Sequence, residues 1–117
     1  MVKRKENPVK DKWWFAGGRV LFNERLVQTA KRKLKEELNI KSFRKIEFLK
    51  AEEMRFKKGR FQRPEHNIIN VFLVELNEKD CAEIQADQTM QGFEWFGKIE
   101  KNFHPYVKRN LKLAGFK

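Results

Sequence analysis

The chain has 117 residues, and its 40% hydrophobic and 13% aromatic content is enough for one modest core, which excludes a disordered chain. No apolar run approaches the roughly 20 residues that cross a membrane, and the lone Cys81 excludes an intramolecular disulfide and a cysteine-based zinc site. The formal net charge of +11 favours anionic partners, either nucleic acid or phosphorylated small molecules, and a lysine-rich solvated surface is the simpler alternative.

The first segments indicate short strands. MVKRK is typical of the tail of a strand, and it is followed by a turn at Asn7-Pro8. The apolar segment KWWFAGG ends in a glycine pair, and RVLF, residues 19–22, predicts a continuing strand. We expect Trp14 to pack in the core, while Trp13 is open to core packing or to stacking on a base.

The next segment predicts an amphipathic helix. Leu26, Ala30, Leu34 and Leu38 recur every four residues and form an apolar stripe, while the other faces carry charged and polar side chains. Asn39 follows the stripe, and asparagine tolerates the left-handed conformation in which many helices end. The helix is therefore expected to end just before Asn39.

The second half predicts further strands and a closing helix. Residues 44–56 and 67–76 indicate two strands joined by the basic turn KKGR, and the second, being almost continuously apolar, is expected to be a central strand covered on both faces. AEIQ (82–85) and FEWF (93–96) predict two short strands, and a last helix begins near Pro105. Without a linker or a repeat, we expect one cytoplasmic α/β or α+β domain over residues 1–117.

Residues 18–40 follow a spaced pattern, G-x5-E-x7-R-K-L-x-E-E-x-N-I. This pattern resembles the Nudix box, G-x5-E-x7-R-E-U-x-E-E-x-G-U, in which U is an aliphatic residue. The matching positions are Gly18, Glu24, Arg32, Leu34, Glu36, Glu37 and Ile40. The departures are Lys33, where the box has Glu, and Asn39, where it has Gly. The resemblance implies a Nudix fold, with a mixed β-sheet sandwiched between helices, and hydrolysis of a nucleoside diphosphate linked to another moiety.

The residue types of the box suit a divalent metal. A diphosphate needs Mg²⁺ or Mn²⁺ to neutralise it and to activate water, and such hard ions take carboxylate and carbonyl oxygens. Glu36 and Glu37 can supply these oxygens, and Arg32, one turn from Glu36, can hold its carboxylate in place. Lys33 cannot ligate a metal and so breaks the usual cluster of three helix carboxylates. Alternatively, these side chains form ordinary exposed helix pairs worth about 0.2–0.5 kcal/mol each.

A second resemblance extends beyond the box, to the GDP-mannose mannosyl hydrolase branch of the superfamily. Its counterparts here are Lys3-Arg4, residues 14–20, Asp87-Gln88, residues 93–95 and residues 104–106. The resemblance implies that Glu37, the carbonyl of Gly17 and Gln88 hold the metal. It also implies that Arg4 and Arg19 grip the diphosphate.

The chain departs from that branch at its catalytic base. The base of the branch is a histidine after the metal-binding glutamine, where this chain has Thr89, and threonine cannot act as a base near neutral pH. His66 matches another histidine of the pattern and is the remaining candidate, with a hydrogen-bonding role at a strand edge as the alternative. The branch tolerates a non-acidic residue at Lys33. It also has a strand upstream of its K-R, so a first strand is expected to be missing before Met1.

The leading prediction is a metal-dependent hydrolase of a nucleotide sugar resembling GDP-mannose, with Glu36, Arg32 and His66 as its catalytic candidates. One alternative is attack at phosphorus on another nucleotide, such as ADP-ribose or a nucleoside triphosphate. The other is a catalytically weak module that binds nucleotide or RNA, favoured by the basic run RFKKGRFQR at residues 55–63. A homodimer is left open, and a membrane partner is not expected.

Overall fold

A computed structural model describes residues 1–6 and 8–117, with Arg60 described by its backbone only. The predicted turn at Asn7-Pro8 includes Asn7, which lies outside the described residues. The elements in chain order are β1 (Val2–Arg4), β2 (Trp13–Trp14), α1 (Leu26–Leu38), β3 (Lys45–Phe56), a 3-10 turn (Arg60–Gln62), β4 (Glu65–Glu75), α2 (Glu78–Ala82), β5 (Met90–Phe93) and α3 (Pro105–Leu113). In the described part of the chain, no helix is both long enough and apolar enough to cross a membrane.

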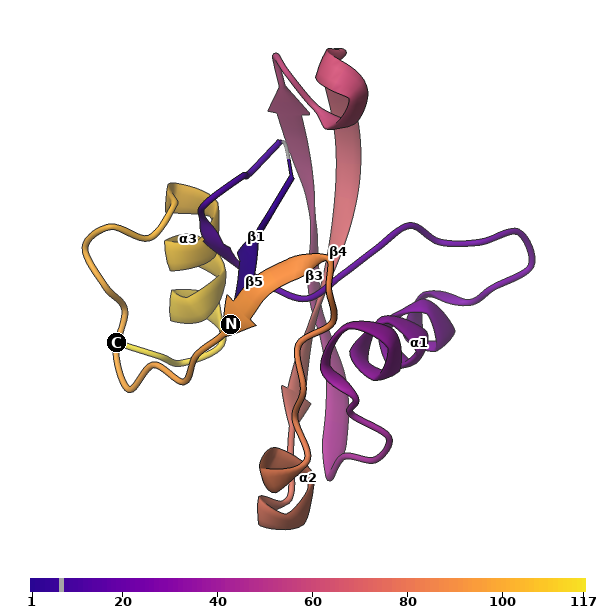
Figure 1. The fold of residues 1–117 in the computed structure, drawn as a ribbon, viewed down its shortest axis with the longest axis vertical. Helices are drawn as coiled ribbons and strands as arrows, with labels where there is room; N and C mark the ends of the chain where they lie inside the picture. Colours follow the sequence, from indigo (N-terminus) through magenta and orange to yellow (C-terminus); the bar gives the residue numbers. More distant parts are fainter. Residues whose placement is uncertain (7) are drawn as a thin grey trace.

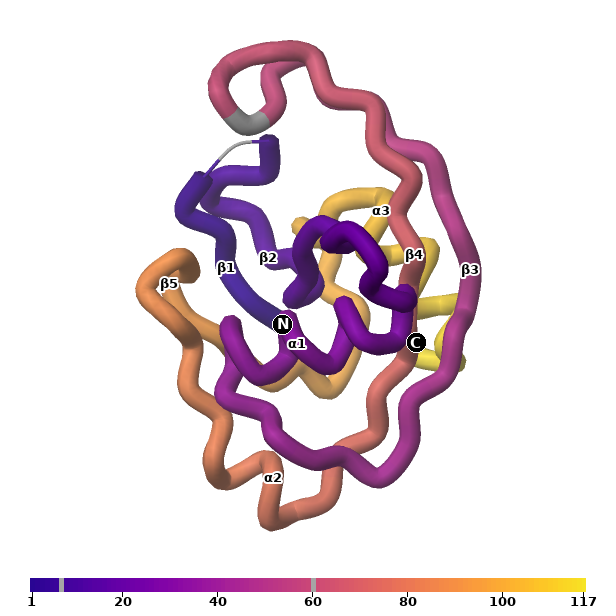
Figure 2. The backbone as a smooth tube through the Cα atoms, turned by 90° about the vertical axis from the view of Figure 1, so that its right-hand side faces the viewer, coloured from indigo at the N-terminus to yellow at the C-terminus, as the bar shows by residue number. Residues whose placement is uncertain are grey.

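The strands lie between two helices and form two sheets. β1 pairs with β2 and β5 in one sheet, and β3 pairs with β4 in a long hairpin that makes the other. Helices α1 and α3 lie on opposite sides of these strands (Figure 1), and in Figure 2 the long hairpin runs along one side of the molecule and the shorter β1 and β5 along the other. The predicted α+β class is confirmed. The ladders of the described residues are all antiparallel, whereas one mixed sheet was expected.

Helix α1 ends at Leu38, just before Asn39, as predicted, because its end is fixed locally. Asn39 adopts the left-handed conformation, with φ 57° and ψ 28°, as predicted. This turn lets the Ile40 N–H donate to the Leu34 carbonyl at 3.1 Å, so that a carbonyl of the last helical turn is paired. Asn23, with φ 62°, makes a second left-handed turn just before the helix. Asparagine thus serves in two places where the backbone needs a positive φ.

The core lies between α3 and the strands and is largely aromatic. Val71, Phe103, Tyr106 and Val107 form its buried centre, with Val107 and Tyr106 at 0% and 2% exposure. Trp14 stacks on Tyr106 with ring centroids 4.7 Å apart, which agrees with the predicted core position. Trp13 packs edge-on against Phe96 at 5.1 Å. The tryptophans therefore tie β2 to the C-terminal part of the chain, at about 0.5–1.5 kcal/mol for each aromatic pair beyond area burial.

The strand predicted at residues 19–22 is wrong. This segment has no strand, and Phe22 at its end is 95% exposed. The Arg19 carbonyl accepts from Nη2 of Arg32 at 2.9 Å, so the backbone here is bonded to a helix side chain rather than to a neighbouring strand. A tertiary contact has overridden the local β-propensity of this apolar run.

Three further strand predictions need correction. AEIQ is not a strand, because α2 runs to Ala82 and the N–H of Gln85 donates to the last carbonyl of α1, at Leu38, at 3.0 Å. Of FEWF, only Phe93 belongs to β5. Within the described residues β4 pairs with β3 alone, and Ile68 on β4 is 71% exposed, so β4 is not a central strand covered on both faces.

Candidate active site

Arg32 joins the loop after the glycine pair to helix α1. Its Nε donates to Glu24 Oε2 at 2.8 Å, and its Nη2 donates to Glu24 Oε1 at 3.0 Å and to the Arg19 carbonyl at 2.9 Å. Its Nη1 lies 3.3 Å from both oxygens of Glu36. The hydrogen bonds from Arg32 and, to a smaller extent, from the Thr29 hydroxyl at 2.6 Å lower the pKa of Glu24 to about 2. Arg32 therefore positions the loop and Glu36, as expected from its spacing, and bonds most closely to Glu24.

Glu37 lies at the centre of the site. The residue is 3% exposed, and its Oε2 accepts the Gly17 N–H at 2.9 Å. Its backbone carbonyl accepts the N–H of Asp87 at 2.9 Å, which brings the loop before β5 against the end of α1. Burial raises the pKa of the Glu37 carboxyl, against the lowering effect of the Gly17 N–H, Lys33 and Arg4. The sequence therefore places a buried carboxylate directly beside the glycine pair.

Lys33 lies between the two adjacent carboxylates. Its Nζ is 3.1 Å from Glu36 Oε2 and 3.5 Å from Glu37 Oε1. Its aliphatic stem passes next to Gly18, where an added Cβ would come within 2.4 Å of the Lys33 Cε. The pKa of Glu36 is lowered mainly by its hydrogen bond from Lys33 and less by the one from Arg32. An alanine at position 18 would therefore require the Lys33 side chain to move.

The two arginines assigned to the diphosphate have different surroundings. Arg4 Nη1 is 3.7 Å from Glu37 Oε1 and contacts the Met90 sulfur at 3.6 Å, so Arg4 points into the site. Arg19 is 75% exposed, and its nearest acid is Glu65, with Nη2 and Oε1 4.0 Å apart. Sequence reasoning missed Glu65, a half-buried carboxylate at the start of β4. Strand alternation places it on the same face as the core residue Val71, which is the signal that could have found it.

His66 lies apart from this cluster. Its Nε2 is 2.6 Å from Glu53 Oε2, and both side chains are more than half exposed on the β3–β4 hairpin. Because neighbouring residues of a strand face opposite sides, His66 points away from the face of Glu65, which approaches Arg19. The assignment of His66 as a base stays a prediction, and this geometry favours the alternative role of a hydrogen bonder at the strand.

Gln88 lies in the loop that docks on α1. The backbone carbonyl of Gln88 accepts from Nζ of Lys5 at 2.8 Å, and its side chain is exposed. Asp87, one residue earlier, donates its N–H to the Glu37 carbonyl and accepts from the N–H of Thr89 at 2.9 Å. The Asp87-Gln88 pair is therefore next to Glu37 in space, and its place as a metal ligand stays a prediction.

The oxygen donors of the site suit a divalent metal, but the neighbouring ammonium does not. Glu37, Glu36 and the Gly17 carbonyl are hard oxygen donors on adjoining elements, the set that Mg²⁺ prefers. Within residues 1–6 and 8–117, however, no three His, Cys, Asp or Glu side chains are grouped closely enough to hold a metal. Lys33 Nζ lies where an ion shared by Glu36 and Glu37 would be. The site thus offers two carboxylates as oxygen donors, and both are paired with Lys33.

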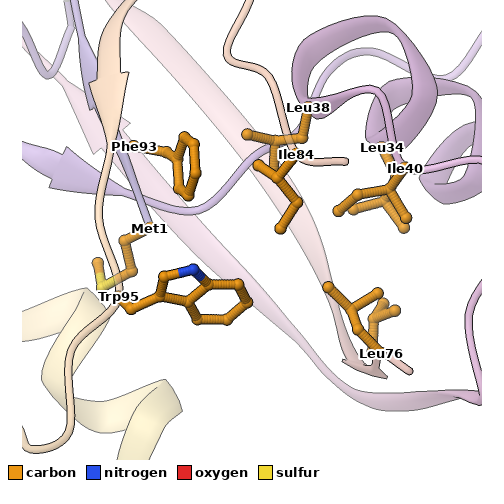
Figure 3. A pocket seen from close by; sticks show the side chains of 9 residues that line it. Met1, Leu34, Leu38, Ile40, Leu76, Ile84, Phe93 and Trp95 are labelled. Carbon is orange, nitrogen blue, oxygen red and sulfur yellow. The ribbon is translucent and has the colours of Figure 1, made fainter. Parts of the chain in front are cut away.

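An apolar pocket lies on another side of α1. Leu34, Leu38 and Ile40 line it from the end of α1, opposite Phe93 and Trp95 (Figure 3). It encloses about 150 Å³, whereas pockets that hold small ligands usually enclose about 300–1,000 Å³. Its lining includes none of the charged residues described above. This pocket is therefore separate from the charged site and too small for a nucleotide.

Comparison with known proteins agrees with the geometry of the loop and helix. The family model described as the NUDIX domain matches residues 1–111, which is most of the chain. A search of curated proteins found no match. The matched residues include the glycine pair, α1 and the docked loop before β5.

Proposed function

Because the chain belongs to the Nudix family, whose members hydrolyse nucleoside diphosphates linked to another moiety and generally use divalent metal ions, we propose that it is a metal-dependent hydrolase of a nucleotide sugar resembling GDP-mannose. The observation that supports this most is the placement of Glu37. A carboxylate that is 3% exposed accepts the Gly17 N–H at 2.9 Å and faces Arg4 at 3.7 Å. The buried Glu37 carboxylate thus has a backbone N–H of the glycine pair and an arginine as neighbours.

The nucleotide-sugar assignment is supported by three distant segments that meet at Glu37. Arg4, Gly17 and Asp87 all contact it, and each belongs to a part of the chain that resembles the mannosyl hydrolase branch. The Nudix box by itself comprises only the glycine loop and the helix, so it accounts for the contact of Gly17 with Glu37 but not for those of Arg4 and Asp87. The convergence of the other two segments on the same residue therefore favours the branch over a general Nudix pyrophosphohydrolase.

The metal would be held by Glu37, Glu36, the Gly17 carbonyl and Gln88. When bound, Mg²⁺ or Mn²⁺ supplies neutralisation of the diphosphate and a lowered pKa for a water ligand. Burial raises the pKa of Glu37, whereas the Gly17 N–H, Lys33 and Arg4 favour its anionic form. Arg32 holds Glu36 at 3.3 Å and so orients a carboxylate that is itself half exposed.

Arg4 and Arg19 would bind the phosphates. Guanidinium groups present paired donors that match phosphate oxygens, which lysines cannot do. Arg4 is 27% exposed beside Glu37, and Arg19 extends from the loop on the other side of the glycine pair. Arg4 would therefore meet a phosphate next to Glu37, and the exposed Arg19 would reach it from the loop that follows the glycine pair.

A second candidate function, binding of nucleotide without turnover, is favoured by two observations. Lys33 already occupies the space between Glu36 and Glu37, and Thr89 stands where the related branch has its base. A site of this kind could bind an anion with its own cations. Attack at phosphorus on ADP-ribose or a nucleoside triphosphate is the remaining alternative within enzymes.

The test is a panel of GDP-mannose, other nucleotide sugars, ADP-ribose and nucleoside triphosphates, each incubated with Mg²⁺ in ¹⁸O-labelled water. We expect release of GDP from GDP-mannose with the label in the sugar. Label in a phosphate product would show attack at phosphorus and contradict the proposed assignment. Binding of the nucleotides with no product above the level of a Glu37→Gln variant would favour the second candidate, and Glu78→Gln, an exposed acid on α2, is the matched control.

A further inference from the structure

We propose that Lys33 is a built-in counter-ion that keeps a bare divalent ion out of the site and moves to the diphosphate when nucleotide and metal bind together. This inference rests on the proposed function, because it concerns the same carboxylates. It adds that the metal binds together with the nucleotide and not before it, which the Nudix box does not imply. In the box this position is a glutamate, which would attract the ion that Lys33 repels.

The placement of Lys33 carries the proposal. Its Nζ pairs with both carboxylates, at 3.1 Å from Glu36 Oε2 and 3.5 Å from Glu37 Oε1. The side chain is 20% exposed, and its stem is confined by Gly18, where a Cβ would come within 2.4 Å of its Cε. A surface lysine in a helix pair would be more exposed and would have no such neighbour. The protein therefore holds the ammonium where the ion would lie.

The acidic and basic side chains around Glu36 and Glu37 are equal in number in the protein without ligand. Three acids, Glu24, Glu36 and Glu37, face three bases, Arg4, Arg32 and Lys33, through the ion pairs described above. A bare divalent ion would enter a neutral neighbourhood and meet an ammonium that shares its carboxylates. Coulomb repulsion at such short range disfavours that event, because the buried Glu37 is poorly screened by water.

A nucleoside diphosphate changes the balance because it offers new acceptors. Its phosphate oxygens can take the Lys33 ammonium and the Arg4 guanidinium, which frees Glu36 and Glu37 for the metal. Metal and nucleotide then strengthen each other's binding by the same factor, as linkage requires. Lys33 is expected to affect the two ligands in opposite directions when each is measured alone. A lysine that acts only through the general field of the protein would produce the same signs but much smaller factors, so the size of the effect relative to an exposed lysine decides.

The experiment measures each ligand separately in the wild type and in Lys33→Met. Mn²⁺ affinity without nucleotide is followed by electron paramagnetic resonance, and the affinity for a fluorescent GDP derivative is measured with EDTA and again with Mg²⁺. In Lys33→Met we expect bare Mn²⁺ to bind roughly 5-fold or more tightly. We expect GDP without metal to bind more weakly by a similar factor. Lys35→Met, which removes the same charge from an exposed position two residues along α1, should change both affinities less than 2-fold.

A second variant tests the placement without removing the charge. Gly18→Ala should push the Lys33 stem aside and shift both affinities in the same directions as Lys33→Met, by smaller factors. Circular dichroism checks that each variant is folded. If Glu37→Gln weakens Mn²⁺ binding while Lys33→Met leaves bare Mn²⁺ affinity at or below that of Lys35→Met, the inference about Lys33 is wrong and the metal site stands. If Glu37→Gln leaves Mn²⁺ binding unchanged, the proposed metal site is wrong, and the inference with it.

Discussion

Two basic regions of the molecule hold their charges in different ways. Around the glycine pair and α1, the cations Arg4 and Arg32 are 27% and 26% exposed and face carboxylates at measured distances of 3.7 and 2.8 Å. At the tip of the β3–β4 hairpin, Lys57 and Lys58 are exposed, and Phe61 next to them is 77% exposed. In Figure 2 this tip stands at the end of the long hairpin, away from α1.

The two kinds of region are expected to act on an anion in different ways: one binds it in a fixed position, and the other only attracts it. A few half-buried guanidinium groups next to a buried acid can fix the position of a small anion, because their donors are already aimed. Exposed lysines on a hairpin contribute a diffuse field that salt screens within about 10 Å. The net charge of +11 is therefore a poor guide to function by itself. What matters is which of the cations have a fixed geometry.

The largest effect is expected at Glu37. Replacing Glu37 with Gln removes the one buried acid of the site and should weaken Mn²⁺ binding by at least about 10–100-fold, the range seen when groups that support a metal are lost. Glu36→Gln should cost less, because Glu36 is half exposed and already shared by Arg32 and Lys33. Titration of Mn²⁺ into each variant measures the two losses of affinity. Equal losses in the two variants would contradict the central place of Glu37.

The next effect compares Arg19, which follows the glycine pair, with the two lysines at the hairpin tip. Arg19→Ala should lower nucleotide-diphosphate affinity by roughly 10-fold or more, as expected for loss of a charged hydrogen bond. Neutralising Lys57 and Lys58 together should cost less than Arg19→Ala and should mainly change the salt dependence. Affinities for GDP and for single-stranded RNA, measured for both variants at two salt concentrations, test this.

RNA binding would reverse the pattern. Loss would then be largest for the Lys57 and Lys58 variant, with a steep dependence on salt, since each phosphate contact releases counter-ions. Arg19 would be nearly neutral. That result would overturn the choice of a nucleotide hydrolase over a nucleic-acid module, and it would move the functional surface from the glycine pair to the hairpin.

Local sequence signals predicted α1 and its end, and they did so because the causes are local. The apolar stripe of α1 and the left-handed turn at Asn39 depend on residues within a few positions of one another. The segment RVLF had an equally clear β pattern and is not a strand, since the Arg19 carbonyl bonds to Arg32 on α1. Local propensity does not contain that contact, which spans 13 positions.

For the site, too, the sequence predicted the residues that are neighbours on one helix but not the contacts between distant segments. The spacing of the box put Arg32, Glu36 and Glu37 on one helix, and the structure adds that Lys33 Nζ lies between the two carboxylates. Strand alternation could have shown that Glu65 faces the core, but its approach to Arg19 within 4.0 Å could not be predicted, because 46 positions separate the two residues and only the fold of the hairpin brings them together. The short strands β1 and β5 offer too few residues for any periodicity to appear.

The ion pair of Glu24 should make the site region sensitive to acid. Its folded pKa of about 2 lies below the ordinary value of 4.5, so its contribution to stability is present above about pH 4.5 and is lost as the pH falls towards 2. Glu24→Gln should therefore lower the melting temperature at pH 7, and the gap to the wild type should narrow over that window. Thermal unfolding followed by circular dichroism at several pH values measures the gap.

The control for Glu24 comes from the hairpin. Glu53 forms an exposed pair with His66, and such pairs contribute about 0–1 kcal/mol. Glu53→Gln should change the melting temperature at pH 7 less than Glu24→Gln does. A gap for Glu24→Gln that stays constant down to pH 2 would mean that Arg32 does not hold Glu24 as an ionised partner.

The smallest effect concerns the backbone at Asn39, at the end of α1. The residue is left-handed with φ 57°, and its Nδ2 donates to the Glu83 carbonyl at 3.1 Å. Asn39→Gly keeps the conformation available but loses this bond and adds freedom to the unfolded chain, so we expect a loss of about 0.5–1 kcal/mol. Asn39→Ala loses the bond and also meets the left-handed penalty of about 1–2 kcal/mol, so its loss should be larger. Urea unfolding gives both values. An alanine variant as stable as the glycine variant would show that α1 does not need this turn, and that the position of Glu37, two residues earlier, is fixed by Gly17 and the docked loop instead.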